Sequence, residues 1–306
     1  MTPSTKTAKH AGPVIDRVGE FDIIECESCG FVHILPIPTE KEMETVYREE
    51  YYATEKPLYL EHHREDLEWW KSSYQQRYDI FENHLPENRR RLLDVGSGPG
   101  NFLLTGRDRG WQVLGIEPSK QAAEYSRNQG LDIVEEFFTR EMASKLEPFD
   151  VVHLSQVLEH ISDPAELLRA AHDALSPDGL LCVAVPNDYN PLQKVLRLAR
   201  KFEPYWLAPP HHINYFSFDS LSSVMERCGF EPIARTTSFP MEMFLLMGHN
   251  YVGSDKLGRE LHGERKLFDL AFEDAGMHKT LAGFYRSLAA EGMGREAIVI
   301  AKRKEK

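Results

Sequence analysis

The sequence predicts a doubly wound, Rossmann-like α/β fold, and three observations support this. Short apolar runs alternate with amphipathic stretches from residue 91 to residue 186, beginning with RLLDV and ending with LLCVAVP. Helix boundary signals separate the runs: Gly130 ends one predicted helix and Asp163-Pro164 opens another. A glycine-rich segment also follows the first run directly. This alternation indicates a mainly parallel sheet with helices on both faces.

The chain is predicted to have three regions. Residues 1–85 form an N-terminal accessory region with a short hairpin, a helix from a Thr39/Glu42 capping box to about residue 49, and a helical pattern over 59–84. Residues 86–237 form the α/β core, interrupted by a Pro- and aromatic-rich insertion at 187–212. Residues 238–306 form a mostly helical C-terminal cap with a closing strand. We expect the insertion and the cap to wall an acceptor pocket, because such scaffolds commonly carry sites on connecting segments.

Composition narrows the class of partner. The 306 residues carry 36 basic and 48 acidic side chains, a net charge of −12, which disfavours nucleic acid as a partner. No apolar run reaches the roughly 18 to 20 residues that span a bilayer, and the polar start lacks a signal-peptide core. We therefore expect a cytoplasmic protein without a membrane span that acts on a small-molecule acceptor. The oligomeric state has no signature in the sequence.

The glycine-rich segment is a candidate cofactor site. Gly96-Ser97-Gly98-Pro99-Gly100 lies between a predicted strand and a helix that begins near Asn101. Glycines allow the backbone to approach a ligand closely, and the N–H groups at a helix start bind carboxylates. Glu117 ends the next predicted strand, 21 residues after Gly96. At that spacing a carboxylate can accept hydrogen bonds from two ribose hydroxyls.

The spacing of the glycines distinguishes between two classes of cofactor. A nicotinamide dinucleotide site favours G-x-G-x-x-G, whereas here the third glycine is Gly100 and Asn101 takes the next position. Asp94 stands immediately before the turn, where its charge serves a pyrophosphate poorly but suits a ligand with an ammonium and a sulfonium. S-adenosylmethionine is therefore favoured over a dinucleotide.

Five segments resemble class I S-adenosylmethionine-dependent methyltransferases in order and spacing: LLDVGSGPGNFL, GIEPS, FDVVHLSQVLEHISDP, LSPDGLLCVAVPN and HHINYFSFDSLSSVMERCGF. The branch is similar to ubiquinone-pathway O-methyltransferases and to sugar or polysaccharide-cluster methyltransferases. The resemblance covers roughly residues 85–237 and implies a seven-stranded sheet with S-adenosylmethionine as cofactor. It implies that Asp94 and the glycines hold the methionine part, Glu117 the ribose, Glu136-Phe137 the adenine, and that Gln156 lies beside the sulfur. The expected cofactor-binding set is Asp94, Gly96, Ser97, Gly98, Gly100, Asn101, Phe102, Glu117, Pro118, Glu136, Phe137 and Gln156.

His160 and His212, together with Glu159, are the candidate catalytic residues. Methyl transfer requires an aligned nucleophile, and a hydroxyl acceptor must also lose a proton, which imidazole accepts near neutral pH. Some relatives place Glu-x-x-Glu-His at this position and bind a divalent cation. Here Gln156 replaces the first Glu, so a divalent metal is not favoured, although His211 or His212 could supply a later imidazole. The sequence leaves open which histidine acts as the base.

Four cysteines are present, and only Cys26 and Cys29 have the spacing of a zinc knuckle. Relatives in sugar biosynthesis often carry two such pairs, and zinc here would need His33 or His10 to complete it. A degenerate hairpin is therefore favoured over a metal site. Cys182 and Cys228 are expected to be small buried thiols. The Tyr51-Tyr52 pair matches a pair in relatives that either closes over the cofactor or belongs to the core.

The predicted function is methyl transfer from S-adenosylmethionine to an O or N atom of a small molecule. A saccharide intermediate is the first candidate acceptor and a phenolic or quinone-like compound the second, by analogy alone. A non-catalytic, S-adenosylmethionine-binding regulatory protein is the alternative. Gln156 in place of a ligand and the reduced cysteine pairs are its support.

Overall fold

The computed structural model describes residues 10–39, 42 and 65–305. Most of the helix predicted from residue 39 to residue 49, and the Tyr51-Tyr52 pair, lie outside these residues. The capping box itself is confirmed: the Thr39 amide and hydroxyl donate to the Glu42 carboxylate at 2.8 and 2.7 Å, and the Glu42 amide donates to the Thr39 hydroxyl at 3.4 Å.

The core is a seven-stranded sheet in the order β10-β11-β8-β7-β4-β5-β6. β4 (Arg91–Val95), β5 (Gln112–Ile116), β6 (Ile133–Val134), β7 (Phe149–Ser155) and β8 (Leu175–Pro186) are mutually parallel. β11 (Glu296–Arg303) runs antiparallel between β8 and β10 (Phe230–Thr236). The expected seven-stranded, mainly parallel sheet is confirmed, including the closing strand.

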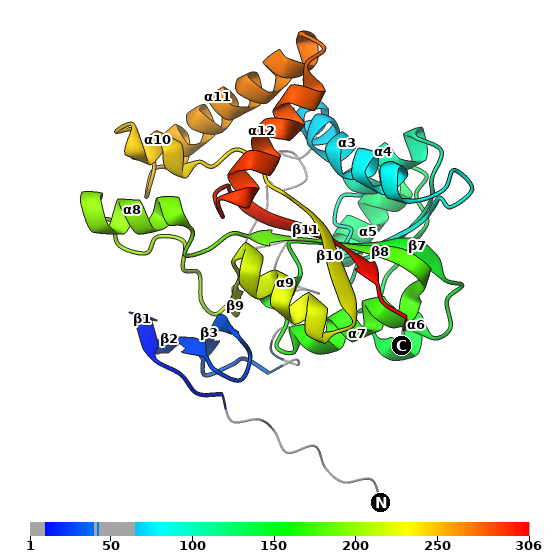
Figure 1. The fold of residues 1–306 in the computed structure, drawn as a ribbon, viewed down its shortest axis with the longest axis horizontal. Helices are drawn as coiled ribbons and strands as arrows, with labels where there is room; N and C mark the ends of the chain where they lie inside the picture. The colour runs from blue at the N-terminus through cyan, green and yellow to red at the C-terminus, as the bar shows by residue number, and fades with distance from the viewer. Residues whose placement is uncertain (1–9, 40–41, 43–64, 306) are drawn as a thin grey trace, which may run out of the picture.

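Helices cover both faces of this sheet (Figure 1). α3 (Leu67–His84), α4 (Asn101–Asp108) and α5 (Lys120–Arg127) lie on one face, and α6 (Arg140–Ala143), α7 (Pro164–Ala174) and α9 (Phe218–Arg227) lie on the other. The two apolar cores follow from the alternation of side chains along a strand. Leu92 packs into the core beneath α3, whereas Leu93 packs into the core beneath α7. Because both faces are covered, the central strands are apolar throughout.

A second, four-stranded antiparallel sheet has the order β1-β2-β3-β9. It consists of β1 (Val14–Val18), β2 (Phe21–Cys26), β3 (Phe31–Leu35) and β9 (Asn214–Tyr215). The hairpin turning at Cys26–Gly30 is confirmed, and β1 precedes it as a strand that the sequence analysis did not predict. β1 is a half-exposed edge strand whose apolar residues, Val14, Ile15 and Val18, do not alternate with polar ones.

The C-terminal region forms the helical cap, at the top of Figure 1. α10 (Glu242–Leu246), α11 (Asp255–Asp274) and α12 (His278–Ala290) share a small core that includes Phe239 and Leu281. The insertion contains α8 (Pro191–Arg200), which an ion pair between Arg197 and Asp16 ties to β1. Within the described part of the chain, no helix combines the length and apolar character needed to cross a bilayer.

Candidate functional site

A cavity of about 620 Å³ opens at the carboxyl ends of β4, β5, β7 and β8. This is where open α/β sheets bind ligands, and the volume falls within the ~300–1,000 Å³ typical of small-molecule sites. The walls come from four parts of the chain: α3, the loops that follow the core strands, the insertion, and the C-terminal cap. The cavity therefore lies among the regions that the sequence assigned to the cofactor and to the acceptor.

The glycine-rich turn has the conformation that only glycine adopts readily. Gly96, Gly98 and Gly100 have φ of 71°, 51° and 77°, in the left-handed region. A Cβ on Gly96 would lie 2.5 Å from a Val157 methyl, and one on Gly100 would lie 2.4 Å from a Leu131 methyl. The turn is thus both strained and tightly packed for any other residue, and α4 begins directly after it.

Asp94 is fixed by a buried chain of hydrogen bonds. Its carboxylate accepts a hydrogen bond from His153 Nδ1 at 2.7 Å, and His153 Nε2 accepts one from Arg77 at 3.0 Å. A guanidinium can only donate, so His153 is a neutral ring with its proton on Nδ1. Burial lowers the pKa of His153, which is consistent with that state. The Phe102 ring stacks on His153 with 3.7 Å between ring centroids.

Glu117, which directly follows β5, fixes the glycine-rich turn. Its two carboxylate oxygens accept hydrogen bonds from the backbone amides of Gly98 and Ser119, both at 2.8 Å. Burial raises the pKa of Glu117 to about 7, against the opposing effect of the two amides. Because a carboxylate has about four acceptor positions, two remain for ribose hydroxyls.

The remaining predicted cofactor residues also gather at this cavity. Glu136 and Phe137 follow β6 and line it, as do Ser97, Asn101 and Pro118. Gln156 follows β7 with a left-handed φ of 56°, and its side chain donates to Glu296 at 3.1 Å. Of the twelve predicted residues, Gly100 alone does not line the cavity; it is instead the N-cap of α4.

The candidate catalytic residues form one cluster beyond Gln156. Glu159 and His160 lie in a short 3₁₀ helix, η2 (Leu158–His160), and His212 approaches from the end of the insertion. One donor atom from each of the three lies within 4.8 Å of the others. His160 and His212 line the cavity, with 4.9 Å between their ring centroids, whereas Glu159 lies behind them with 1% of its surface exposed.

The hydrogen bonds of His160 indicate its tautomer. Nδ1 lies 2.7 Å from the carbonyl of His211, so it carries the proton and donates it to that oxygen. Nε2 lies 3.6 Å from Glu159. In the neutral ring Nε2 is therefore the basic nitrogen, and a carboxylate stands beside it to stabilise the imidazolium. Of the two histidines proposed as the later imidazole, His212 lines the cavity and His211 does not.

Several polar residues at the site were missed by the sequence analysis. Arg77, with 1% of its surface exposed, supports His153 from α3, and Glu296 supports Gln156 from β11. A charged residue on the aromatic face of a predicted helix could have drawn attention to Arg77. Arg295 and Glu296 gave no comparable signal, because only the pairing of β11 with β8 brings them to the cavity.

The insertion and the cap supply a wall that is both aromatic and polar. Tyr205 and Trp206, with 5.4 Å between ring centroids, line the cavity from the insertion. Tyr251 and Arg265 line it from the cap. Asp188 also lines it, and burial raises its pKa to about 7. This wall offers ring faces and hydrogen-bonding groups to a second ligand beside the glycine-rich turn.

The chain is similar both to a protein family and to individual curated proteins. Residues 60–235 match the family described as "Methyltransferase domain". A ubiquinone biosynthesis O-methyltransferase from Caulobacter sp. (strain K31) is 34% identical over 40% of this chain and 51% of its own length. One from Ruegeria pomeroyi is 31% identical over 47% of this chain and 61% of its own length. The chain thus spans about half the length of the curated relatives it matches.

Solved structures confirm the fold. An S-adenosylmethionine-dependent methyltransferase from Archaeoglobus fulgidus is 18% identical, has a TM-score of 0.51, and covers 78% of this chain and 94% of its own. Magnesium protoporphyrin IX methyltransferase from Synechocystis PCC 6803, solved with S-adenosylhomocysteine bound, is 11% identical, also has a TM-score of 0.51, and covers 86% and 100%. At these identities the likeness concerns the architecture of the sheet and its helices.

Proposed function

We propose, from the premise that this chain belongs to the class I S-adenosylmethionine-dependent methyltransferases, that it methylates an O or N atom of a small polar acceptor, with a saccharide intermediate as the first candidate. The observation that carries this proposal is that one cavity contains the glycine-rich turn, the His160/His212 pair, and the aromatic and polar wall. Donor, base and acceptor would therefore meet in one enclosed space.

The turn fits S-adenosylmethionine, since Gly96, Ser97 and Gly98 line the cavity and the glycines let the backbone approach a ligand closely. Asp94 is placed for the ammonium group, the backbone amides of the turn for the carboxylate, and Glu117 for the ribose hydroxyls. Glu136 and Phe137 would flank the adenine. When bound, the cofactor supplies an electrophilic methyl group.

The histidine pair would remove the proton of the acceptor. His160 Nε2 or the His212 ring accepts the proton as the oxygen or nitrogen attacks, and Glu159 stabilises the charged ring. Alignment of the two ligands would supply much of the remaining rate. Because the three donor atoms lie within 4.8 Å of one another, a divalent cation is the competing use of this cluster.

The acceptor wall favours a saccharide. Tyr205 and Trp206 offer flat faces for the C–H face of a sugar ring, while Asp188 and Gln193 offer groups for its hydroxyls. A phenolic or quinone-like acceptor is the second candidate, since relatives matched over about half their length are named ubiquinone biosynthesis O-methyltransferases.

The test is a methyl-transfer assay with two acceptor panels, one of free and nucleotide-linked sugars and one of catechols and hydroxybenzoates. Release of S-adenosylhomocysteine and the mass of the methylated product are measured, with and without added Mg²⁺. Turnover of a sugar supports the proposal, and turnover of catechols alone replaces it with the second candidate. Tight binding of S-adenosylhomocysteine without turnover of any acceptor in either panel would instead favour a non-catalytic, S-adenosylmethionine-binding regulatory protein.

A further inference from the structure

The geometry points to a second ligand site, none of whose residues lines the cavity: we propose that His10, Cys26, Cys29 and His33 bind one zinc ion. Cys26 ends β2, Cys29 lies in the turn that follows, and His33 is in β3. His10 comes from the segment that precedes β1. One donor atom from each of the four residues lies within 4.8 Å of the others.

The three distances from His10 to the other donor atoms are close to the edges of a zinc tetrahedron. Zn–S and Zn–N bonds of about 2.3 and 2.05 Å imply N···N edges of about 3.4 Å and S···N edges of about 3.6 Å. His10 Nδ1 lies 3.1 Å from His33 Nε2, 3.4 Å from Cys29 Sγ and 3.9 Å from Cys26 Sγ. Each edge is thus within a few tenths of an ångström of the value that a shared ion requires.

A second observation concerns the orientation of His33. Its Nδ1 lies 2.9 Å from the carbonyl oxygen of Ile34, so this nitrogen carries the proton and donates it. The Nε2 lone pair therefore points at His10 and the cysteines. A backbone carbonyl that fixes the tautomer in this way is the usual second partner of a histidine that binds a metal. His33 and Cys26 are both 1% exposed, so their donor atoms are held within the structure.

The donor set identifies the metal and its role. Two thiolates and two imidazoles in a tetrahedral arrangement suit zinc, and four protein ligands leave no open position for catalysis. A structural ion would also stabilise this small sheet, because among the described residues its apolar cluster has four fully buried members, Ile23, Ile34, Ile213 and Tyr215. The missing second Cys-x-x-Cys pair, which had favoured a degenerate hairpin, is replaced by His10 and His33.

The site would also support the catalytic cluster. His33 is the register partner of Asn214 in β9. The side-chain amide of Asn214 donates to the backbone carbonyls of Leu158 and Ile161 at 3.0 and 2.7 Å. These two residues lie on either side of His160 in the sequence. A zinc ion bound to His10 and the hairpin would stabilise β3. It would thereby stabilise β9, whose Asn214 anchors the segment that contains His160.

The first test is the metal content of the full chain, purified with zinc present and then dialysed. Elemental analysis is expected to give about one zinc per chain for the wild type and for Cys228→Ser, a control thiol at the end of α9. The Cys26→Ser/Cys29→Ser double variant is expected to hold less than a tenth of that amount. Zinc far below one per chain in the folded wild type, or retained by the double variant, would overturn the proposal.

Cobalt substitution gives a second readout that does not depend on how the double variant folds. Co²⁺ in the wild-type protein is expected to show tetrahedral d–d absorption together with a thiolate-to-cobalt charge-transfer band. The Glu159–His160–His212 cluster contains no sulfur and cannot produce that band. His10→Gln, which keeps three ligands, is expected to bind Co²⁺ at least tenfold more weakly in competition with a chelator. Binding without the charge-transfer band, or unchanged affinity in His10→Gln, would contradict the site.

Discussion

At the scale of single residues, Asp94 offers the most direct test of the cofactor site. Its carboxylate is held by His153 at the base of the cavity, where it would face the ammonium group of the ligand. Asp94→Asn keeps the shape and removes the charge. A charge-assisted hydrogen bond contributes about 2 kcal/mol, so binding of S-adenosylhomocysteine is expected to weaken about thirtyfold. Isothermal titration calorimetry measures this. Asp219→Asn, at an exposed ion pair with Arg235, is the matched control and should bind like the wild type.

Glu117 is expected to make cofactor binding depend on pH. Burial raises the pKa of Glu117 from 4.5 to about 7, so below pH 7 the unliganded folded protein holds a proton on this carboxyl. The unfolded chain releases that proton near 4.5, so the stability from this group is fully present below 4.5 and is lost as the pH rises to 7. In the proposed site the ribose hydroxyls would donate to the ionised carboxylate of Glu117, so ligand binding would displace the proton.

The affinity for S-adenosylhomocysteine is therefore expected to rise as the pH increases towards 7 and to level off above it. Below pH 7 the limiting slope is about tenfold per pH unit, with up to one proton released on binding. Calorimetry at pH 5.5 to 8.5, in buffers of different ionisation enthalpy, measures both quantities. Glu117→Gln should bind more weakly and lose the pH dependence; a pH dependence unchanged in this variant would exclude Glu117 as its source.

His160 and His212 are expected to affect turnover more than cofactor binding. Glutamine at either position retains an N–H donor but accepts no proton near pH 7. Loss of a general base typically costs about 10²- to 10⁴-fold in rate, so one of the two variants should lower kcat by that factor and leave S-adenosylhomocysteine binding within a few-fold of wild type. His84→Gln, at an exposed histidine whose ring hydrogen-bonds the Ile80 carbonyl, is the control. Unchanged kcat in both variants would remove the histidines from the reaction.

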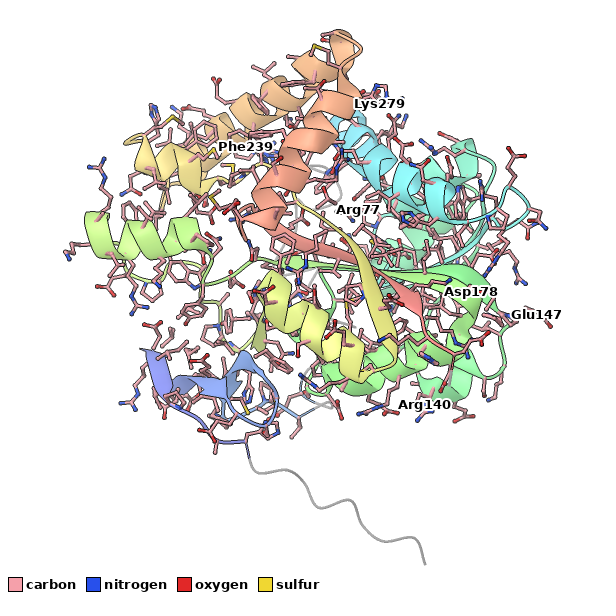
Figure 2. All side chains as sticks on the ribbon, viewed as in Figure 1. Arg77, Arg140, Glu147, Asp178, Phe239 and Lys279 are labelled. Atoms are coloured by element: carbon pink, nitrogen blue, oxygen red, sulfur yellow. The ribbon has the colours of Figure 1, made fainter. Side chains whose placement is uncertain are left out.

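At the scale of elements, Arg77 is a buried cation that links α3 to the sheet, in addition to the apolar packing of that helix. Arg77 lies at the centre of the molecule (Figure 2), where it donates to His153 in β7 at 3.0 Å and stands 3.9 Å from Glu296 at the start of β11. Removing one partner of a buried charge pair costs about 3 kcal/mol or more. Arg77→Met is therefore expected to lower the Tm by roughly 8 °C in a thermal unfolding experiment.

Lys71→Met is the matched control, since it removes a cation from an exposed pair with Glu68 on the same helix. Such pairs contribute at most about 1 kcal/mol, so its Tm should change by less than about 3 °C. Equal losses in the two variants would show that the Arg77 network does not hold α3 on the sheet.

The elements that could be predicted are those with local signals. The two faces of the sheet follow from apolar runs such as RLLDV, and α7 begins where Asp163 caps it by accepting a hydrogen bond from the Glu166 amide at 3.0 Å. β1 was missed because its five residues, VIDRV, do not alternate between apolar and polar side chains. β9 has two residues, too few for any period to appear, and it exists because β3 pairs with it.

At the scale of the whole molecule, the same division applies to the site. Gly96, Gly98 and Glu117 could be located because strand, turn and spacing lie close together in the sequence. Arg265 and Glu296 could not, because contacts between distant segments bring them to the cavity. His10 and Cys26 are 16 residues apart, and only the path of β1 beside β2 brings them close enough to share an ion.

Ligand binding is expected to stabilise the whole fold, since the turn connects β4 to α4 at the middle of the sheet. At one hundred times its Kd, S-adenosylhomocysteine should add about 2.7 kcal/mol and raise the Tm by about 7 °C, whereas NADH should leave it unchanged. In Gly98→Asp the new carboxylate would stand beside Glu117, which accepts the Gly98 amide, so the shift should vanish. Gly110→Asp is the matched control: this glycine also has a positive φ, of 85°, but nothing lies within 4 Å of a Cβ there. If S-adenosylhomocysteine raised the Tm of Gly98→Asp as much as that of the wild type, the cofactor would bind elsewhere. If NADH alone raised the Tm, the cofactor would be of another class.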